Sequence, residues 1–161
     1  NSAEHSWHLT AAVLALHSQS NVPINLERAL KIALVHDIVE IDADDTFVYD
    51  TTGSETKYER EKQAAERIFG LLPTALGEEL KNLWHAYEIQ ECPESHFVAS
   101  LDRLLPIIAN FHTEGHSWKK HGIRSHQVIE RNKHIERGST SLWNYALSLV
   151  SQSIEKGYLE K

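Results

Sequence analysis

Methionine is absent from the 161 residues, and cysteine occurs once, as Cys92. A lone cysteine cannot form an intramolecular disulfide, which fits a protein of the reducing cytoplasm. No apolar run approaches the roughly 18 residues of a membrane-spanning helix, and no secretory signal peptide is recognisable. Basic residues are also few, because 16 Lys and Arg stand against 23 Asp and Glu, for a formal charge of -7. That balance argues against a general nucleic-acid-binding surface, which needs a basic stripe.

The rest of the composition is typical of one globular domain, which we assign to residues 1–161. Apolar residues make up 41% and charged residues 24%, as in ordinary globular proteins, and the length allows a sizeable core. The sequence opens inside a helical pattern without an initiator methionine, so we expect residues upstream of Asn1.

Apolar residues recur at spacings of three and four, and no stretch alternates as a strand does, so the fold class expected is all-α. Ser2 and Asn25 are the expected N-caps of the first two helices. Pro106 should loosen the hydrogen bonds of the fifth helix just beyond Asp102. The expected helices cover about 2–16, 26–40, 54–71, 73–91, 94–111, 125–136 and 139–156, with loops at 18–25, 41–53 and 112–122.

Three of these helices carry polar residues on otherwise apolar faces. His5 heads the inner stripe of the first helix, the His36-Asp37 pair follows the apolar end of the second, and Asp102 interrupts the stripe of the fifth. An unpaired buried charge costs several kcal/mol or more. One divalent metal would satisfy all four groups, and a set of two imidazoles and two carboxylates suits Mn, Co, Fe, Ni or Zn better than Ca or Mg.

Taken singly, two of these residues have plainer explanations. His5 could be an ordinary histidine at a helix end, and Asp102 could pair with a buried Arg or Tyr. The adjacent His36 and Asp37 are harder to explain as solvated surface, since they follow an apolar helix. The joint pattern, on three helices that would otherwise each carry an unexplained polar defect, favours the metal.

The order His5, His36-Asp37, Asp102 resembles the metal signature of the HD-domain phosphohydrolases, and more closely their 5′-deoxynucleotidase-like branch. The stretches that carry the resemblance are 3–7, 35–46 and 101–104. It implies a single-domain, HD-type helical bundle with one divalent metal, often a homodimer. It also implies release of phosphate from (deoxy)nucleoside 5′-monophosphates by a metal-bound water.

The resemblance further implies roles for residues beyond the metal ligands. Glu40 and Asp45 match acidic residues that the branch uses in catalysis. We expect Glu40 to orient or deprotonate the attacking water and Asp45 to protonate the leaving 5′-oxygen, although the two roles could be reversed. Asp44 departs from the pattern, since the branch usually has Gly there. The branch's phosphate-binding basic residue lies upstream of the His5 motif.

A substrate phosphate needs a cation opposite the metal, because phosphoryl transfer depends on positioning and charge stabilisation. For each candidate cation in this sequence, a position on the solvated surface or in a salt bridge is the alternative to binding phosphate. The candidates are Lys57, Arg60 and Arg103.

Weaker signals come from histidines and aromatic residues. The histidines of the later part of the chain could form a second metal site, but a surface position explains them more simply. Some aromatic residues could stack on a nucleobase, but their helical spacing favours core packing. These residues are His112, His116, His121 and His126, and Trp7, Trp84 and Tyr87.

Three other functions compete with the phosphomonoesterase. One is a phosphodiesterase or nucleotide pyrophosphatase of the same fold, which often needs a second metal. Another is a nucleotide- or metal-sensing module without turnover, for which Glu40 and Asp45 would be dispensable. The last is a helical interaction domain whose polar groups satisfy one another.

Overall fold

The computed structural model describes residues 1–43 and 57–161, without the side chain of Lys57. The described residues fold into helices and contain no strand. Their β-type pairing is confined to one isolated bridge between Arg124 and Glu160. The all-α prediction is confirmed. In the same part of the chain, no helix combines the length and hydropathy needed to cross a bilayer.

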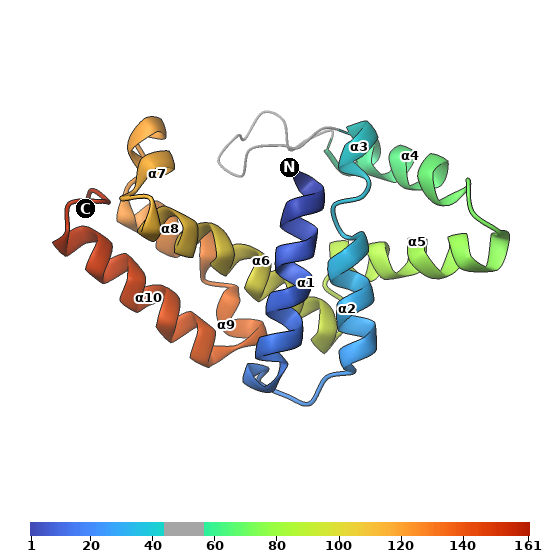
Figure 1. Ribbon diagram of the computed structural model, residues 1–161, viewed down its shortest axis with the longest axis horizontal. Helices are drawn as coiled ribbons and strands as arrows, with labels where there is room; N and C mark the ends of the chain where they lie inside the picture. Colours follow the sequence, from blue (N-terminus) through green and yellow to red (C-terminus); the bar gives the residue numbers. More distant parts are fainter. Residues whose placement is uncertain (44–56) are drawn as a thin grey trace.

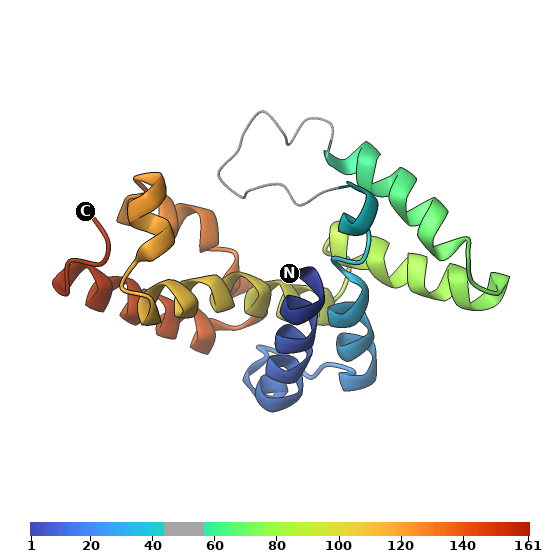
Figure 2. The same ribbon diagram turned by 45° about the horizontal axis from the view of Figure 1, so that its top comes forward.

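The longest described helix, α6 (Pro93–His112), forms the axis of the molecule (Figure 1). Several helices pack against it, among them the short α7 (His116–His121) and five others. Two of the five, α1 and α2, lie side by side near its N-terminal half (Figure 2). The five are α1 (Ser2–Leu16), α2 (Leu26–Val35), α5 (Thr74–Glu88), α9 (Ile135–Gly138) and α10 (Thr140–Glu155).

The other described helices are placed around this arrangement. Helix α4 packs against both α5 and the short α3, so the two flank it in the part of the fold away from α10 (Figure 1). Arg60 of α4 donates a hydrogen bond from its guanidinium to the backbone oxygen of Ala43, at the end of α3. The bounds are η1 (His17–Gln19), α3 (Glu40–Ala43), α4 (Lys57–Phe69), α7 (His116–His121) and α8 (Ser125–Asn132).

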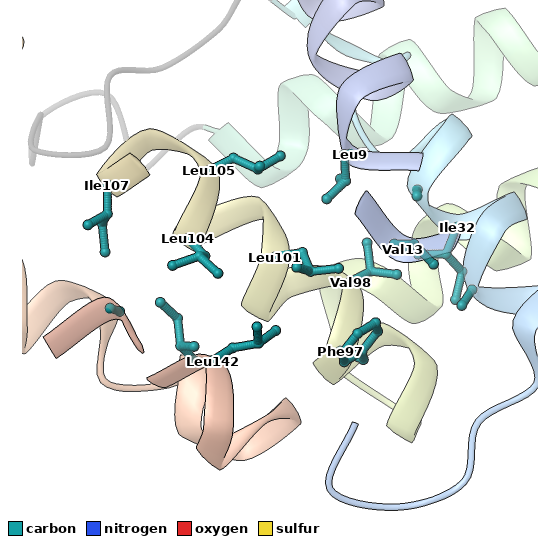
Figure 3. Close-up of a cluster of buried hydrophobic side chains, with 14 of the residues drawn as sticks. Leu9, Val13, Ile32, Phe97, Val98, Leu101, Leu104, Leu105, Ile107 and Leu142 are labelled. Atoms are coloured by element: carbon teal, nitrogen blue, oxygen red, sulfur yellow. The ribbon is translucent and has the colours of Figure 1, made fainter. Parts of the chain in front are cut away.

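The core follows both faces of α6 (Figure 3). Phe97, Val98 and Leu101 are 0% exposed and face Leu9 and Val13 of α1 or neighbouring helices. A helix apolar on more than one side is typical of the centre of a bundle. Because the residues flanking Asp102 are fixed by this packing, the position of that carboxylate is fixed with them.

Helix ends match the predictions in part. Asn25 caps α2 by accepting a hydrogen bond from the backbone NH of Arg28, as predicted. Helix α1 is capped by Asn1 rather than Ser2, because Asn1 and Glu4 form a reciprocal capping box. The Ser2 hydroxyl is therefore free for another contact, described below.

The expected loop at 112–122 was wrong, because α7 occupies 116–121. Gly115 and Gly122 are its two caps, with φ of 74° and 62°. Glycine adopts this left-handed conformation at little cost and commonly ends helices there. The single helix expected at 125–136 is interrupted at residues 133–134, which separate α8 from α9.

The apolar stripes of α4 and α5 are buried or half-buried except at single positions. Ala65 of α4 and Leu83 of α5 are buried, whereas Tyr58 is 44% and Leu76 is 43% exposed. Glu61 of α4 is buried at 4% exposure although it is charged. It precedes the buried Ala65 by four positions, so the two share a face.

Replacement of Leu101 by Ala should lower the free energy of unfolding by about 2–5 kcal/mol, since it leaves a cavity beside a fully buried helix. The matched control is Leu71→Ala, because Leu71 is 73% exposed and surface changes usually stay within about 0.5 kcal/mol. Urea unfolding in chelator measures both. Equal effects of the two variants would contradict the placement of the core.

Candidate metal centre

Three of the predicted ligands meet within a few ångströms although they come from different parts of the chain. His5 lies on α1, and His36 and Asp37 immediately follow α2. Each offers one ligand atom, and these atoms all lie within 4.8 Å of one another. The fourth predicted residue, Asp102 of α6, places Oδ1 2.9 Å from His5 Nε2 and 3.9 Å from His36 Nε2.

The local backbone at His36 differs from the prediction that α2 continues to Glu40. The helix ends at Val35, residues 36–39 form a turn, and Glu40 begins α3. The backbone NH groups of Ile38 and Glu40 bond to oxygens three residues back rather than four. This part of the sequence is rich in β-branched residues, which have low helix propensity. The tighter turn changes the direction in which consecutive side chains point.

The ring of His36 is oriented by the backbone of its own helix. Its Nδ1 lies 3.0 Å from the carbonyl oxygen of Ala33, and since a carbonyl only accepts, Nδ1 carries the proton and donates. In the neutral ring, Nε2 then holds the lone pair. Metal-binding histidines are commonly held by such a bond from the other ring nitrogen.

Nε2 of His36 is buried and makes no well-directed hydrogen bond. Oδ1 of Asp37 is 3.1 Å away, but the contact lacks hydrogen-bond geometry. Burial disfavours the charged ring, yet the neighbouring Asp37 and Asp102 carboxylates outweigh it and raise the pKa of His36. A buried ring nitrogen close to two carboxylates is a place where positive charge is stabilised, whether a proton or a metal supplies it.

His5 and Asp102 form the shortest polar contact of the site. The hydrogen bond to Asp102 is the main cause that raises the pKa of His5, against the effect of burial. Burial would raise the pKa of Asp102, but the hydrogen bond from His5 and the charge of His36 lower it to about 2. Asp102 is therefore anionic at any ordinary pH, and a metal bound here would displace the His5 proton.

The second oxygen of Asp102 faces α5. The Tyr87 hydroxyl donates to Oδ2 at 3.0 Å, and Arg103 Nε lies 3.8 Å from the same oxygen. Burial and the adjacent carboxylate raise the pKa of Tyr87 well above its ordinary value, so the phenol keeps its proton. The sequence left open a buried Arg or Tyr as the partner of Asp102, and both lie beside it without removing the carboxylate from the cluster.

Glu40 lies at the edge of the cluster. Its Oε2 accepts a hydrogen bond from the Ser2 hydroxyl at 3.0 Å, which ties the start of α3 to the start of α1. The Glu40 charge also contributes to raising the pKa of His5. The predicted acid Asp45, together with Asp44 and the side chain of Lys57, lies outside the described residues.

Of the other predicted substrate cations, Arg60 is bound to the Ala43 backbone oxygen, and the Arg103 side chain is 33% exposed beside Asp102. The late histidines are all exposed, and in residues 1–43 and 57–161 no second group of three potential ligands is found. Trp84 is buried as expected, whereas Trp7 is 73% exposed, contrary to the core position its spacing suggested. The late histidines are His112, His116, His121 and His126.

The donor set fits a divalent metal. It offers two imidazole nitrogens and at least two carboxylate oxygens. Within the described residues, Arg103 is the nearby cation that partly offsets the charge of these carboxylates. One imidazole is held in the ligating tautomer. Such mixed nitrogen and oxygen ligation suits first-row transition metals.

A comparison with protein-family models matches residues 1–143 to the HD domain. The chain belongs to the HD domain family. This agrees with the resemblance carried by His5, His36-Asp37 and Asp102, and with the all-α fold. The family match covers both the elements that carry the predicted ligands and most of the core.

Known relatives of this HD domain include 5′-deoxynucleotidases. It is 37% identical to 5′-deoxynucleotidase HDDC2 of Danio rerio over 106 residues, covering 66% of this chain and 52% of that protein. It is 33% identical to 5′-deoxynucleotidase hdd1 of Schizosaccharomyces pombe over 116 residues, covering 70% and 57%. The matched part thus spans about half the length of these relatives.

A solved structure shares the whole fold of this HD domain. It is the crystal structure of a predicted metal-dependent phosphohydrolase from Magnetospirillum magnetotacticum MS-1. The TM-score is 0.94 at 42% sequence identity, and the match covers 100% of this chain and 81% of that chain.

The His5–Asp102 pair should make the stability of the metal-free protein depend on pH. The raised pKa of His5 contributes stability that is full below its ordinary 6.5 and is lost as pH rises through the raised value. The lowered pKa of Asp102 contributes stability that is full above 3.8 and is lost toward 2. His5→Gln should therefore destabilise the protein more at pH 5.5 than at pH 8.5.

Urea unfolding in chelator at the two pH values checks this. His8→Gln is the control, because it removes an exposed histidine from the same helix. A loss for His5→Gln that is the same at both pH values would show that the ion pair does not form.

Proposed function

We propose that this HD domain is a metal-dependent phosphohydrolase that releases phosphate from (deoxy)nucleoside 5′-monophosphates. The observation that carries the proposal is the convergence of His5, His36, Asp37 and Asp102 from separate elements onto one partly buried point. The names of the relatives and of the solved structure support the same reaction class and the nucleotide substrate.

The four converging side chains would hold one divalent transition metal, with Mn, Co, Fe, Ni and Zn as the candidates. When bound, such a metal supplies Lewis-acid stabilisation of phosphoryl charge and makes hydroxide available near neutral pH. The side chains supply the rest of the site. The bond from His36 to Ala33 orients its ring, and Asp37 and Asp102 supply the negative charge that keeps a cation in place.

Glu40 is the proposed general base. Glu40 directly follows the turn that carries His36 and Asp37. It therefore lies next to the proposed ligands but is not one of them. The Ser2 hydroxyl holds Oε2, so the carboxylate has a defined orientation for receiving a proton from the attacking water. Asp45 is the proposed acid for the leaving 5′-oxygen, by the resemblance alone.

The substrate phosphate requires positive charge on the side facing solvent. Arg103 is the proposed contributor among the described cations, because it lies beside the ligand Asp102 and its side chain is one-third exposed. Lys57 and Arg60 remain candidates from the sequence, although the guanidinium of Arg60 already binds the α3 backbone.

The alternatives make different demands on the site. A phosphodiesterase or pyrophosphatase often uses two metals, and a single candidate cluster in the described residues favours the monoesterase. A sensing module would bind nucleotide or metal without using Glu40. The Glu40 carboxylate lies beside the cluster and is oriented by the Ser2 hydroxyl, which favours an enzyme.

We also propose a homodimer in the reducing cytoplasm. Two large apolar side chains of α1, Trp7 and Leu14, are 73% and 56% exposed and lie seven positions apart, on one face of the helix. Exposed apolar surface of this kind is often covered by another protein surface. The single free Cys92 suits a reducing compartment. Sedimentation velocity distinguishes a dimer of this chain from a monomer.

Phosphate release from a panel of ribo- and deoxynucleoside monophosphates tests the function, with Mn, Co, Zn or Mg added to chelator-treated protein. We expect turnover only with a transition metal. Glu40→Gln should lower kcat by about 10²–10⁴-fold, the usual contribution of a general base. The same carboxylate-to-amide change at Glu130 of α8, which pairs with Lys133 just beyond the helix, is the control and should leave kcat unchanged.

Each other outcome selects an alternative. Turnover of diesters but not monoesters would replace the phosphomonoesterase by a phosphodiesterase. Metal-dependent nucleotide binding without turnover would favour the sensing module. A chain whose stability is unchanged by chelator or by added metal would have no metal centre at all.

A further inference from the structure

Tyr87 contacts two of the proposed ligands without being a ligand itself. Its hydroxyl donates to Oδ2 of Asp102 at 3.0 Å. Its ring meets the ring of His36 edge-on, with centroids 5.0 Å apart and planes at 67°. Tyr87 belongs to α5, which carries none of the four ligands, so it brings a further helix to the site.

Because Tyr87 binds one oxygen of Asp102, the two oxygens of that carboxylate have different partners. Oδ2 is directed to the phenol of Tyr87, while Oδ1 faces the imidazole of His5 at 2.9 Å and that of His36 at 3.9 Å. A carboxylate that can rotate is able to bind a metal through either oxygen or through both. A hydrogen bond to one oxygen removes that freedom, provided that the donor is itself held in place.

Tyr87 meets that condition because its ring packs against His36, whose own ring is fixed by Ala33. Arg103 cannot replace it as the donor. Its Nε is 3.8 Å from Oδ2, which is longer than a hydrogen bond, and its side chain is one-third exposed. Among the described residues, the phenol is thus the hydrogen-bond donor that fixes Oδ2 of Asp102.

We propose that Tyr87 is a positioning residue that makes Asp102 a ligand through Oδ1 alone, and that its ring restrains the His36 ring by packing against it. The proposal rests on the proposed metal centre. Partners of this kind orient metal ligands and typically change metal affinity by about 10–100-fold when removed. Binding through one oxygen leaves a coordination position that a second carboxylate oxygen would otherwise take.

The test is Tyr87→Phe, which removes the hydroxyl and keeps the ring against His36. Titration of chelator-treated protein with Co²⁺, in competition with a chromophoric chelator, should give a Kd raised about 10–100-fold. The visible absorption of the bound Co²⁺ should weaken, because a freed Asp102 that binds through both oxygens raises the coordination number. Tyr158→Phe is the matched control, since Tyr158 packs on Phe111, and should change neither quantity.

A second variant separates positioning from a general effect on folding. In an Asp102→Ala background, Tyr87→Phe should have no further effect on the Kd for Co²⁺, because the oxygen it positions is gone. The same loss in both backgrounds would overturn the proposal. So would an unchanged Kd and an unchanged spectrum for Tyr87→Phe in the otherwise unmodified chain.

A crystal of the unmodified chain soaked with Mn²⁺ gives a test that needs no variant. We expect Asp102 to bind through Oδ1 with Oδ2 still on the Tyr87 hydroxyl. Binding through both oxygens would overturn the positioning role. If the unmodified chain binds no Co²⁺ or Mn²⁺, the metal centre itself fails, which is a different result from a metal centre that is indifferent to Tyr87.

Discussion

Like charges brought together in a partly buried place are the constraint on which the rest of this structure depends. Asp37, in the turn after α2, and Asp102 of α6 face the same space, and a buried imidazole nitrogen lies close to both. Such a group is costly unless positive charge neutralises it. In the metal-free state the carboxylates favour the charged form of both rings, so the pKa values of His5 and His36 are raised.

A site of this kind can form only where the surrounding structure holds the groups together against their repulsion. Helix α6 provides that support, since Leu101 and Leu104 on either side of Asp102 are almost fully buried. Pro106 has no NH to donate, so the backbone oxygen of Asp102 lacks the usual partner four residues on. Helix α6 nevertheless runs unbroken from 93 to 112, because packing rather than one backbone bond stabilises it.

The convergence of the predicted ligands could be anticipated from sequence because each is a polar exception on an apolar stripe. Periodicity shows which face of a helix a residue occupies, so His5 and Asp102 could both be placed inward before any coordinates. The same reasoning failed at His36, where it extended α2 to Glu40. Tight turns between β-branched residues leave no periodic signal, and the His36-Asp37 pair reaches the site from such a turn.

Partners that act through one contact were beyond the reach of the sequence. Tyr87 belongs to an apolar stripe, so its spacing predicts a core residue. Nothing in that spacing shows that its hydroxyl binds a carboxylate 15 positions away. Ser2 was assigned to a cap that Asn1 supplies, so its bond to Glu40 was missed. Buried Glu61 was placed on the surface for a related reason: charged residues are assumed to be exposed, and only tertiary structure shows the exception.

The site also bears on how the fold and the metal depend on each other. A metal at the proposed site would join α1, the turn after α2, and α6, which are elements up to 97 positions apart. Binding to the folded state alone would stabilise that state. In small metal-dependent domains the chain is unfolded without the ion. Here the fully buried side chains of α1, α2 and α6 pack around Leu101, outside the polar cluster. A core of that extent does not depend on the ion, so a metal at the proposed site would find its ligands already assembled, and its binding energy would not be consumed in ordering them.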